Sequence, residues 1–126
     1  MELISTHSVM TIDIGVHDNL FGGRLMGWID TAAAAFAKQK SRSFSVVTKK
    51  VSEMIFFKPA SVNNLLKIYG EVAHIGNTSI TINIEARRVD VLTCEEELMC
   101  TTTLVFVNID NDGKPTPILV GKGCGC

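Results

Sequence analysis

Residues 22–40 read GGRLMGWIDTAAAAFAKQK, and this stretch decides the fold. Its apolar residues recur at three- and four-residue steps, which is the period of an α-helix. These residues are Leu25, Met26, Ile29, Ala32, Ala33, Phe36 and Ala37. The pattern predicts a helix from about Gly23 to Lys40, and Asn19 is placed to cap its start. Because the helix is apolar around much of its circumference, we expect a sheet to cover it on more than one side.

Strand patterns fill most of the remaining chain. They run over residues 2–12, where the signal is weakest, and over 46–57, 65–74, 80–85 and 98–109. Apolar and polar residues alternate most clearly over 80–85, which is the period of a strand with one buried face. The connections after the helix are short, and short connections between successive strands imply antiparallel pairing. The sequence therefore predicts an α+β fold, with one long central helix wrapped by a curved, mostly antiparallel sheet.

Length and composition exclude several classes of protein. The 126 residues suit one domain, which we place at residues 1–118, followed by a flexible Gly- and Cys-containing tail at 119–126. Twelve basic residues against thirteen acidic ones give a net charge of −1, too little positive charge for a nucleic-acid-binding domain. No apolar run approaches the roughly 20 residues that cross a membrane, and the first residues do not resemble a signal peptide. We therefore expect a cytoplasmic protein with neither a nucleic-acid nor a membrane partner.

The four cysteines are expected to be reduced thiols in that compartment. Cys124 and Cys126 are close enough in sequence to bind a soft metal. However, no histidine is near them, and a zinc site usually takes four ligands. We therefore expect no functional metal site.

Two features in the first half of the helix indicate a catalytic site. Gly22 and Gly23 lie where backbone N–H groups lack partners within the helix, and such groups bind anions or the oxyanion of a tetrahedral intermediate. Asp30 lies on an otherwise apolar helix stripe, so its carboxylate is partly withdrawn from water. Asp30 is therefore a candidate general base or nucleophile. A carboxylate at the helix edge, paired with a nearby Lys or Arg, is the alternative, and the residues alone leave the two open.

The segment from Asp13 to Asp30 has the order Asp-x7-Phe-Gly-Gly-x-x-Met-x-x-Ile-Asp. It resembles the hotdog-fold acyl-CoA thioesterases, and most closely their short-chain bacterial branch of YciA-like acyl-CoA thioester hydrolases. Further segments match that family in the same order, namely 46–48, 54–59, 76–80 and 106–115. The resemblance covers about residues 10–118. It implies a hotdog fold, hydrolysis of acyl-CoA to fatty acid and CoA without a cofactor, and a homo-oligomer, a hexamer built as a trimer of dimers.

The resemblance also implies roles for single residues. Asp30 is implied to activate water or to attack the thioester, while the N–H groups of Gly22 and Gly23 hold the thioester oxygen. Thr48 is implied to line the site from the strand of the facing subunit. The residues implied to bind CoA or the substrate are Lys58, Lys50, Asn19, Thr78 and Ser79.

One position departs from the family's pattern. Many relatives carry Asn two residues after the first Asp of the motif, where this chain has Gly15, and a glycine three residues later, where it has Asp18. Gly15 has no side chain to orient the thioester or the water. His17 and Asn19 are the candidates to replace the missing Asn, and His17 is the freer of the two because Asn19 is expected to cap the helix.

Two other functions remain open. A hotdog hydratase or dehydratase uses a loop histidine and a helix acid, and His17 with Asp30 has that order and spacing. Such an enzyme removes the enoyl-CoA absorbance without releasing a thiol. A non-catalytic acyl-CoA-binding protein, in contrast, binds acyl-CoA tightly without turnover. The Phe-Gly-Gly sequence at the start of the helix argues against the hydratase or dehydratase. An acid among alanines argues against the non-catalytic binding protein.

Overall fold

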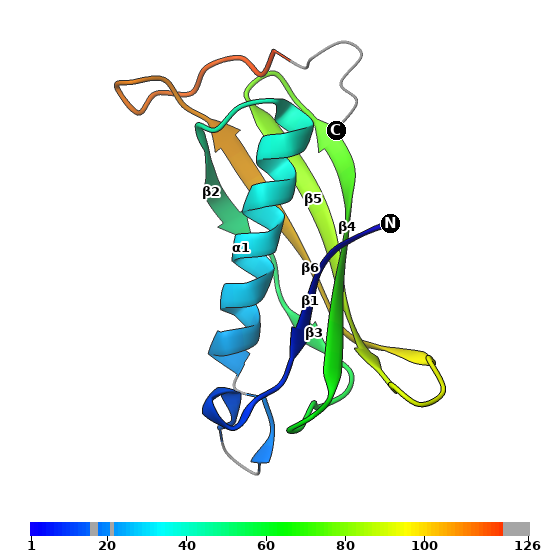
Figure 1. Cartoon of the computed structure of the whole chain (residues 1–126). Helices are drawn as coiled ribbons and strands as arrows, with labels where there is room; N and C mark the ends of the chain where they lie inside the picture. Colours follow the sequence, from blue (N-terminus) through cyan, green and yellow to red (C-terminus); the bar gives the residue numbers. More distant parts are fainter. Residues whose placement is uncertain (16–17, 21, 120–126) are drawn as a thin grey trace.

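The computed structural model describes residues 1–15, 18–20 and 22–119, and a long helix lies at its centre (Figure 1). This helix, α1, spans Gly22–Ser41, so the helix predicted over 23–40 is confirmed to within one residue at each end. Asn19 as the helix cap is wrong. The helix begins three residues later, and Asn19 instead pairs with Ser61 in an isolated antiparallel bridge.

Within the described residues, six strands form one sheet around α1. In chain order they are β1 (Glu2–Ser8), β2 (Val46–Val51), β3 (Ile55–Phe56), β4 (Leu65–Ile75), β5 (Ser79–Val89) and β6 (Glu96–Asn108). Neighbours across the sheet run β1-β4-β5-β6-β2, and β3 also pairs with β6. Every pairing among these strands is antiparallel, which confirms the predicted α+β architecture.

The strand predicted over 46–57 is wrong as a single element. The chain leaves the ladder between β2 and β3, which pair with different stretches of β6. Ser52 fixes the break. Its N–H and its Oγ both donate to Thr103 O, at 2.8 and 3.0 Å, and the Thr103 N–H donates back to Ser52 Oγ. A side-chain hydroxyl that bonds to the backbone in this way replaces the regular ladder, and alternation of apolar residues does not report such a replacement.

The weak strand predicted over 2–12 ends early, with β1, and a short 3-10 turn, η1 (Thr11–Asp13), follows it. Asp13 is buried. Its Oδ2 accepts a hydrogen bond of 2.9 Å from the Met10 N–H, and its Oδ1 lies 3.2 Å from Arg24 Nε. The first aspartate of the motif therefore ties the loop before α1 to the first turn of that helix.

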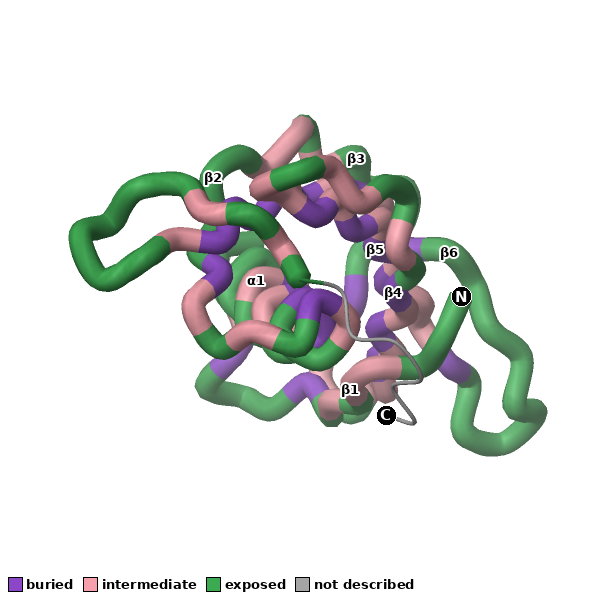
Figure 2. Tube along the Cα trace, turned by 90° about the horizontal axis from the view of Figure 1, so that it is seen from above, coloured by how far each residue is buried: buried purple, intermediate pink, exposed green. Residues whose placement is uncertain are grey.

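The sheet curves around α1, as the view along the helix in Figure 2 shows. The helix contacts β1, β2, β4, β5 and β6, which confirms that the sheet covers it on several sides. The largest fully buried side chains come from both layers, and they include Leu25, Ile29, Leu66, Ile68, Ile80, Ile82, Ile84, Leu104 and Phe106. Burial of each side chain of this size stabilises the fold by about 1.5–3 kcal/mol. This core fixes the position of α1 along its own axis relative to β2.

The two ends of α1 lie in different surroundings. At its N-terminal end the Leu20 N–H donates to Ala60 O. Beyond its C-terminal end Ser43 Oγ donates to Asn108 Oδ1, and the Asn108 N–H donates to Thr78 O. A helix of 20 residues is about 30 Å long, so these two groups of contacts lie at opposite ends of the molecule.

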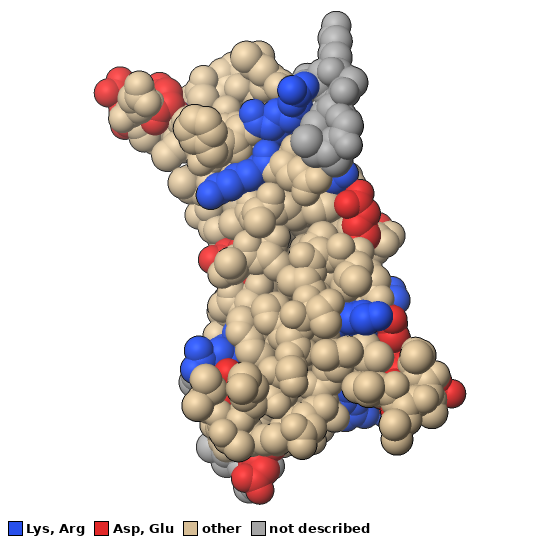
Figure 3. Space-filling model, in the orientation of Figure 1, with Lys and Arg blue, Asp and Glu red and all other residues tan. Residues whose placement is uncertain are grey.

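The face of the molecule that shows α1 carries few charges along its middle (Figure 3). The Lys, Arg, Asp and Glu side chains on this face gather toward its ends and edges. Met26 of α1 and Val47 of β2 are exposed, at 41% and 45%. The chain's own sheet therefore leaves apolar surface open beside the helix. No helix in the part of the chain that the structure describes is long and apolar enough to cross a membrane.

Candidate active site

Two polar side chains pair beside the middle of α1. Thr48 of β2 donates its hydroxyl hydrogen to Asp30 Oδ1 over 2.9 Å. Asp30 is half-buried, as expected for a carboxylate on an apolar helix stripe. The hydrogen bond engages one carboxylate oxygen and thereby orients the other, Oδ2. Thr48 thus contacts the aspartate of its own chain, and its expected place in the site of a facing subunit stays a prediction.

A groove of about 340 Å³ opens in front of this pair, between α1 and the segment that follows it. We call it the Asp30 groove, and its lining residues are Gly23, Met26, Gly27, Ile29, Asp30, Thr48, Val51, Met54 and Leu104. Asp30 and Thr48 supply its polar side chains, and the other walls are apolar or glycine. Small-molecule sites usually have this form, with a few placed polar groups in an apolar cleft. The apolar walls also strengthen the electrostatic interactions of the carboxylate.

Gly27 is among the residues of this groove that sequence reasoning did not place in a site. It lies inside α1, where glycine is less favourable than alanine by about 1 kcal/mol. A Cβ atom added at Gly27 would meet no atom within 4 Å apart from the backbone of its own helix, so packing against other elements does not require a glycine there. The available signal was a glycine within an otherwise regular helical pattern.

Gly22 and Gly23 lie in the first turn of α1, where N–H groups have no acceptor within the helix. They are not adjacent to Asp30 of the same chain, because the seven residues from Gly23 to Asp30 correspond to about 10 Å of helix rise. A thioester under attack lies within about 3.5 Å of the attacking group and about 3 Å of its oxyanion donors. The Gly22–Gly23 turn therefore lies about two helical turns from Asp30, and Gly23 lines the same groove.

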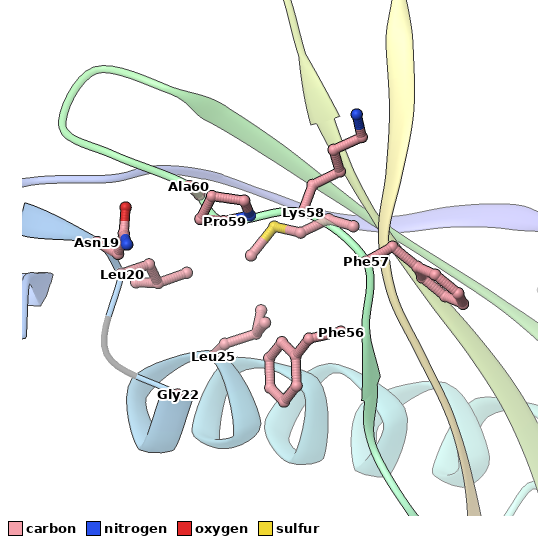
Figure 4. A pocket seen from close by; sticks show the side chains of 10 residues that line it. Asn19, Leu20, Gly22, Leu25, Phe56, Phe57, Lys58, Pro59 and Ala60 are labelled. Atoms are coloured by element: carbon pink, nitrogen blue, oxygen red, sulfur yellow. The ribbon is translucent and has the colours of Figure 1, made fainter. Parts of the chain in front are cut away.

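A second hollow, of about 390 Å³, lies at the N-terminal end of α1 (Figure 4). We call it the Lys58 cavity, and its lining residues are Asn19, Leu20, Gly22, Leu25, Phe56, Phe57, Lys58, Pro59, Ala60 and Met99. Leu25 from α1 points into it and the Phe56 ring from β3 lies beside Leu25, whereas the Lys58 side chain points away from it. The cavity is therefore apolar inside, with its cation at the rim.

Lys58 is paired with a carboxylate. Its Nζ lies 3.7 Å from Glu97 Oε2, which also lies 2.9 Å from Arg88 Nη2. Arg88 Nη1 donates to Pro59 O over 2.7 Å and so fixes the turn that carries Lys58. Sequence reasoning missed Arg88 in this role, because its partners lie on other strands and turns and share no local pattern with it.

The other predicted binding residues are spread over the molecule. Lys50 is exposed on β2, two residues past Thr48. Ser79 begins β5 and Thr78 precedes it, at the C-terminal end of α1 and about a helix length from Lys58. A single chain therefore does not gather these residues into one site. His17 lies outside the described residues.

His7 of β1 stacks on Trp28 of α1, with ring centroids 4.4 Å apart and an angle of 5° between the planes. Burial lowers the pKa of His7, and the negative charge of Asp13 opposes that shift. Neither ring lines the Asp30 groove or the Lys58 cavity. This pair therefore belongs to the packing of β1 on the helix.

The cysteines differ in environment. Cys100 is buried, and burial raises the pKa of its thiol to about 11, whereas Cys94 is exposed. Cys124 and Cys126, with most of the tail predicted over 119–126, lie outside the described residues. Over residues 1–15, 18–20 and 22–119, no group of three or more His, Cys, Asp or Glu side chains is placed to hold a metal ion.

Comparison of the sequence with known families and proteins gives consistent matches. The family model of the thioesterase superfamily matches residues 17–95. The acyl-CoA thioester hydrolase YciA of Salmonella typhimurium is 34% identical over 122 residues, which cover 94% of this chain and 91% of that protein. An uncharacterized acyl-CoA thioester hydrolase of Bacillus subtilis, YkhA, is 31% identical over 93% of this chain and 67% of its own length.

Solved structures agree with these matches. A hexameric thioesterase from Yersinia pestis superposes with a TM-score of 0.86 at 31% identity, covering 95% of this chain and 97% of its own. An acyl-CoA hydrolase from Staphylococcus aureus, solved with butyryl coenzyme A and coenzyme A, superposes with the same TM-score at 29% identity. The match covers 92% of this chain and 70% of that one. The hydrolase has also been solved as single alanine variants of an asparagine, an aspartate and a threonine.

Proposed function

This chain belongs to the thioesterase superfamily, and on that premise we propose that it is an acyl-CoA thioester hydrolase, which cleaves acyl-CoA to a fatty acid and CoA. The observation that carries the proposal is the Asp30–Thr48 pair at the head of an apolar groove. A half-buried carboxylate, held by one oxygen and open toward an apolar cleft, suits hydrolysis of a substrate whose acyl part is apolar.

In the proposed mechanism Asp30 acts through Oδ2. As a general base it takes a proton from water, and the hydroxide adds to the thioester carbonyl carbon. The tetrahedral intermediate then collapses, the C–S bond breaks, and the CoA thiolate leaves and takes up a proton. As a nucleophile, Asp30 would instead expel the thiolate and form an anhydride, which water then opens. In a single turnover in H₂¹⁸O, label in the Asp30 side chain identifies the second route, because water that opens the anhydride at the Asp30 carbonyl leaves its oxygen there.

The oxyanion donors in this proposal are the N–H groups of Gly22 and Gly23 of a second copy of the chain. Support comes from the distance along α1, since about 10 Å of rise keeps these groups away from Asp30 of their own chain. A second chain that completes the site would also cover the open apolar surface beside α1. We therefore propose a homo-oligomer with a dimer as its smallest active unit, and a hexamer as the full assembly. The hexameric thioesterase from Yersinia pestis supports this assembly.

Lys58 and Lys50 are the proposed contacts for the CoA phosphates, with Asn19, Thr78 and Ser79 as further substrate contacts. The exposure of both lysine side chains supports this role, because a phosphate reaches an exposed cation without displacing core groups. Thr78 and Ser79 lie a helix length from Lys58, so they would serve a CoA molecule held by another copy. His17 and a cytoplasmic location remain predictions from the sequence.

The test is a thiol-release assay over a series of acyl-CoA substrates, from acetyl-CoA to longer chains. We expect one thiol per substrate consumed. Loss of crotonyl-CoA absorbance without thiol would favour the hydratase instead, and tight binding without turnover would favour a binding protein. Cys94 is exposed and accessible to the thiol reagent, so the reagent consumed by the enzyme alone is subtracted and the Cys94→Ser variant serves as a control. Light scattering during the assay gives the size of the active assembly.

A further inference from the structure

Gly27 lies three residues before Asp30, on the same wall of the Asp30 groove. Side chains on a helix lean toward its N-terminus, so a residue covers the surface over the turn before it. The carboxylate of Asp30 therefore leans over the turn that contains Gly27. The space above Gly27 is the space in front of the reactive group.

The chain leaves this space empty even though glycine weakens the helix. A Cβ atom at Gly27 would meet nothing within 4 Å apart from the backbone of its own helix, so no neighbouring element requires the glycine. Its φ angle is also not in the left-handed region, where glycine is favoured. Within the chain, neither packing against other elements nor backbone conformation requires Gly27, so the open space above it is free for a molecule from outside the chain.

The walls around this space indicate what that occupant is. Val51, Met54 and Leu104 form the side opposite α1, and all three are apolar. The polar groups of the groove, Asp30 and Thr48, lie at the reacting end. Apolar walls favour an acyl chain over the amide-rich arm of CoA. The unbranched side chain of Met54 can adapt to acyl groups of different shapes.

Resting on the proposed hydrolase function, we infer that Gly27 is a specificity-determining residue, which keeps open the stretch of the Asp30 groove in which the acyl chain of the substrate lies. An alanine at position 27 would place a methyl group in that path. The rival occupant is a second copy of the chain, packed closely on the helix at this point. The two differ in what the methyl group disturbs, acyl binding in one case and assembly in the other.

The test compares Gly27→Ala with Thr31→Ala, a change on an exposed helix position outside the groove. Both changes improve helix propensity, so both should raise the Tm, by about 3–5 °C for Gly27→Ala. S-butyl-CoA, a thioether that cannot be hydrolysed, should bind Gly27→Ala at least about tenfold more weakly than the parent, while free CoA binds equally. For butyryl-CoA the kcat/KM should fall about 10- to 100-fold, with a smaller loss for acetyl-CoA. Thr31→Ala should keep the parental binding and kcat/KM.

Two results would overturn the inference. One is parental binding and hydrolysis in Gly27→Ala while the parent releases thiol, which leaves the hydrolase function intact. The other is a lower Tm or a dissociated assembly in Gly27→Ala, which assigns Gly27 to a subunit contact. A parent that releases no thiol refutes the proposed function, yet selective weakening of S-butyl-CoA binding would still support the acyl path.

If Gly27→Ala does not fold, Met54→Ala serves instead. It should shift preference toward bulkier acyl groups, and an unchanged preference would contradict the inference.

Discussion

The Asp30 groove and the Lys58 cavity flank the same helix, but they are built differently. In the groove, a half-buried carboxylate is held at 2.9 Å by a hydroxyl from another element, among apolar walls. At the cavity, the cation points outward from the rim and is about half exposed, 3.7 Å from a carboxylate. The difference matches what each task demands. Bond making requires reacting atoms placed to within a fraction of an ångström, whereas attraction of a phosphate tolerates a mobile charge in water.

The comparison therefore predicts that changes in the groove act on kcat and that changes at the cavity rim act on KM. Interactions made only in the transition state affect kcat, whereas contacts made equally to substrate and transition state affect KM alone.

The largest expected effect is that of Asp30→Asn. The amide keeps the shape of the side chain and its hydrogen bond to Thr48, but it is neither a base nor a nucleophile. We expect kcat to fall by about 10² to 10⁴ with little change in Tm. Thiol release under saturating acyl-CoA measures the first and calorimetry the second. A parental kcat would remove Asp30 from the mechanism.

Thr48→Val should have the next largest effect. Valine has the shape of threonine but cannot donate to Asp30 Oδ1, so the carboxylate loses its fixed orientation. A misplacement of about 1 Å can reduce the rate 10²-fold, and we expect kcat to fall about 10- to 100-fold with KM nearly constant. Thr48→Ser, which restores the hydroxyl, is the control and should recover most of the rate. Equal losses in both variants would show that the hydroxyl is not what matters.

Lys58→Ala tests the other side of the comparison. We expect KM for acyl-CoA to rise about three- to tenfold, with kcat unchanged, and KM to depend less on salt concentration. Lys114→Ala is the matched control, because it removes an exposed lysine from the turn at the far end of the chain. If Lys58→Ala and Lys114→Ala give the same KM, the phosphates bind elsewhere.

The smallest effect concerns His7, which lines neither hollow. Its pKa is lowered in the folded protein, so the unfolded chain binds a proton more readily. Stability should therefore decrease modestly as the pH falls below the ordinary histidine pKa of 6.5 and be fully present above it. His7→Phe retains a ring to stack on Trp28 and should flatten the dependence of Tm on pH between 7.5 and 5. A dependence that persists in His7→Phe would assign it to another group.

Much of the fold could be predicted from local patterns. The helix over 23–40 and the strands over 65–74 and 98–109 are confirmed with small changes in their bounds, because periodic burial is written into each segment. The break inside 46–57 could not be predicted, since it depends on Ser52 bonding to Thr103, which lies 51 residues away. The cap assigned to Asn19 failed because the helix begins only at Gly22, three residues later.

The sequence by itself determined that this chain has an apolar central helix carrying one aspartate on a buried stripe, because spacing along a helix fixes which residues share a face. It also identified the family through the order of short motifs. Only the tertiary structure decided that Thr48 holds Asp30 and that Gly27 lies on the wall of the groove below the carboxylate. These relations depend on where β2 lies along α1, and that position is set by the register of β2 on β6 and by the packing of the whole core, which no local pattern encodes.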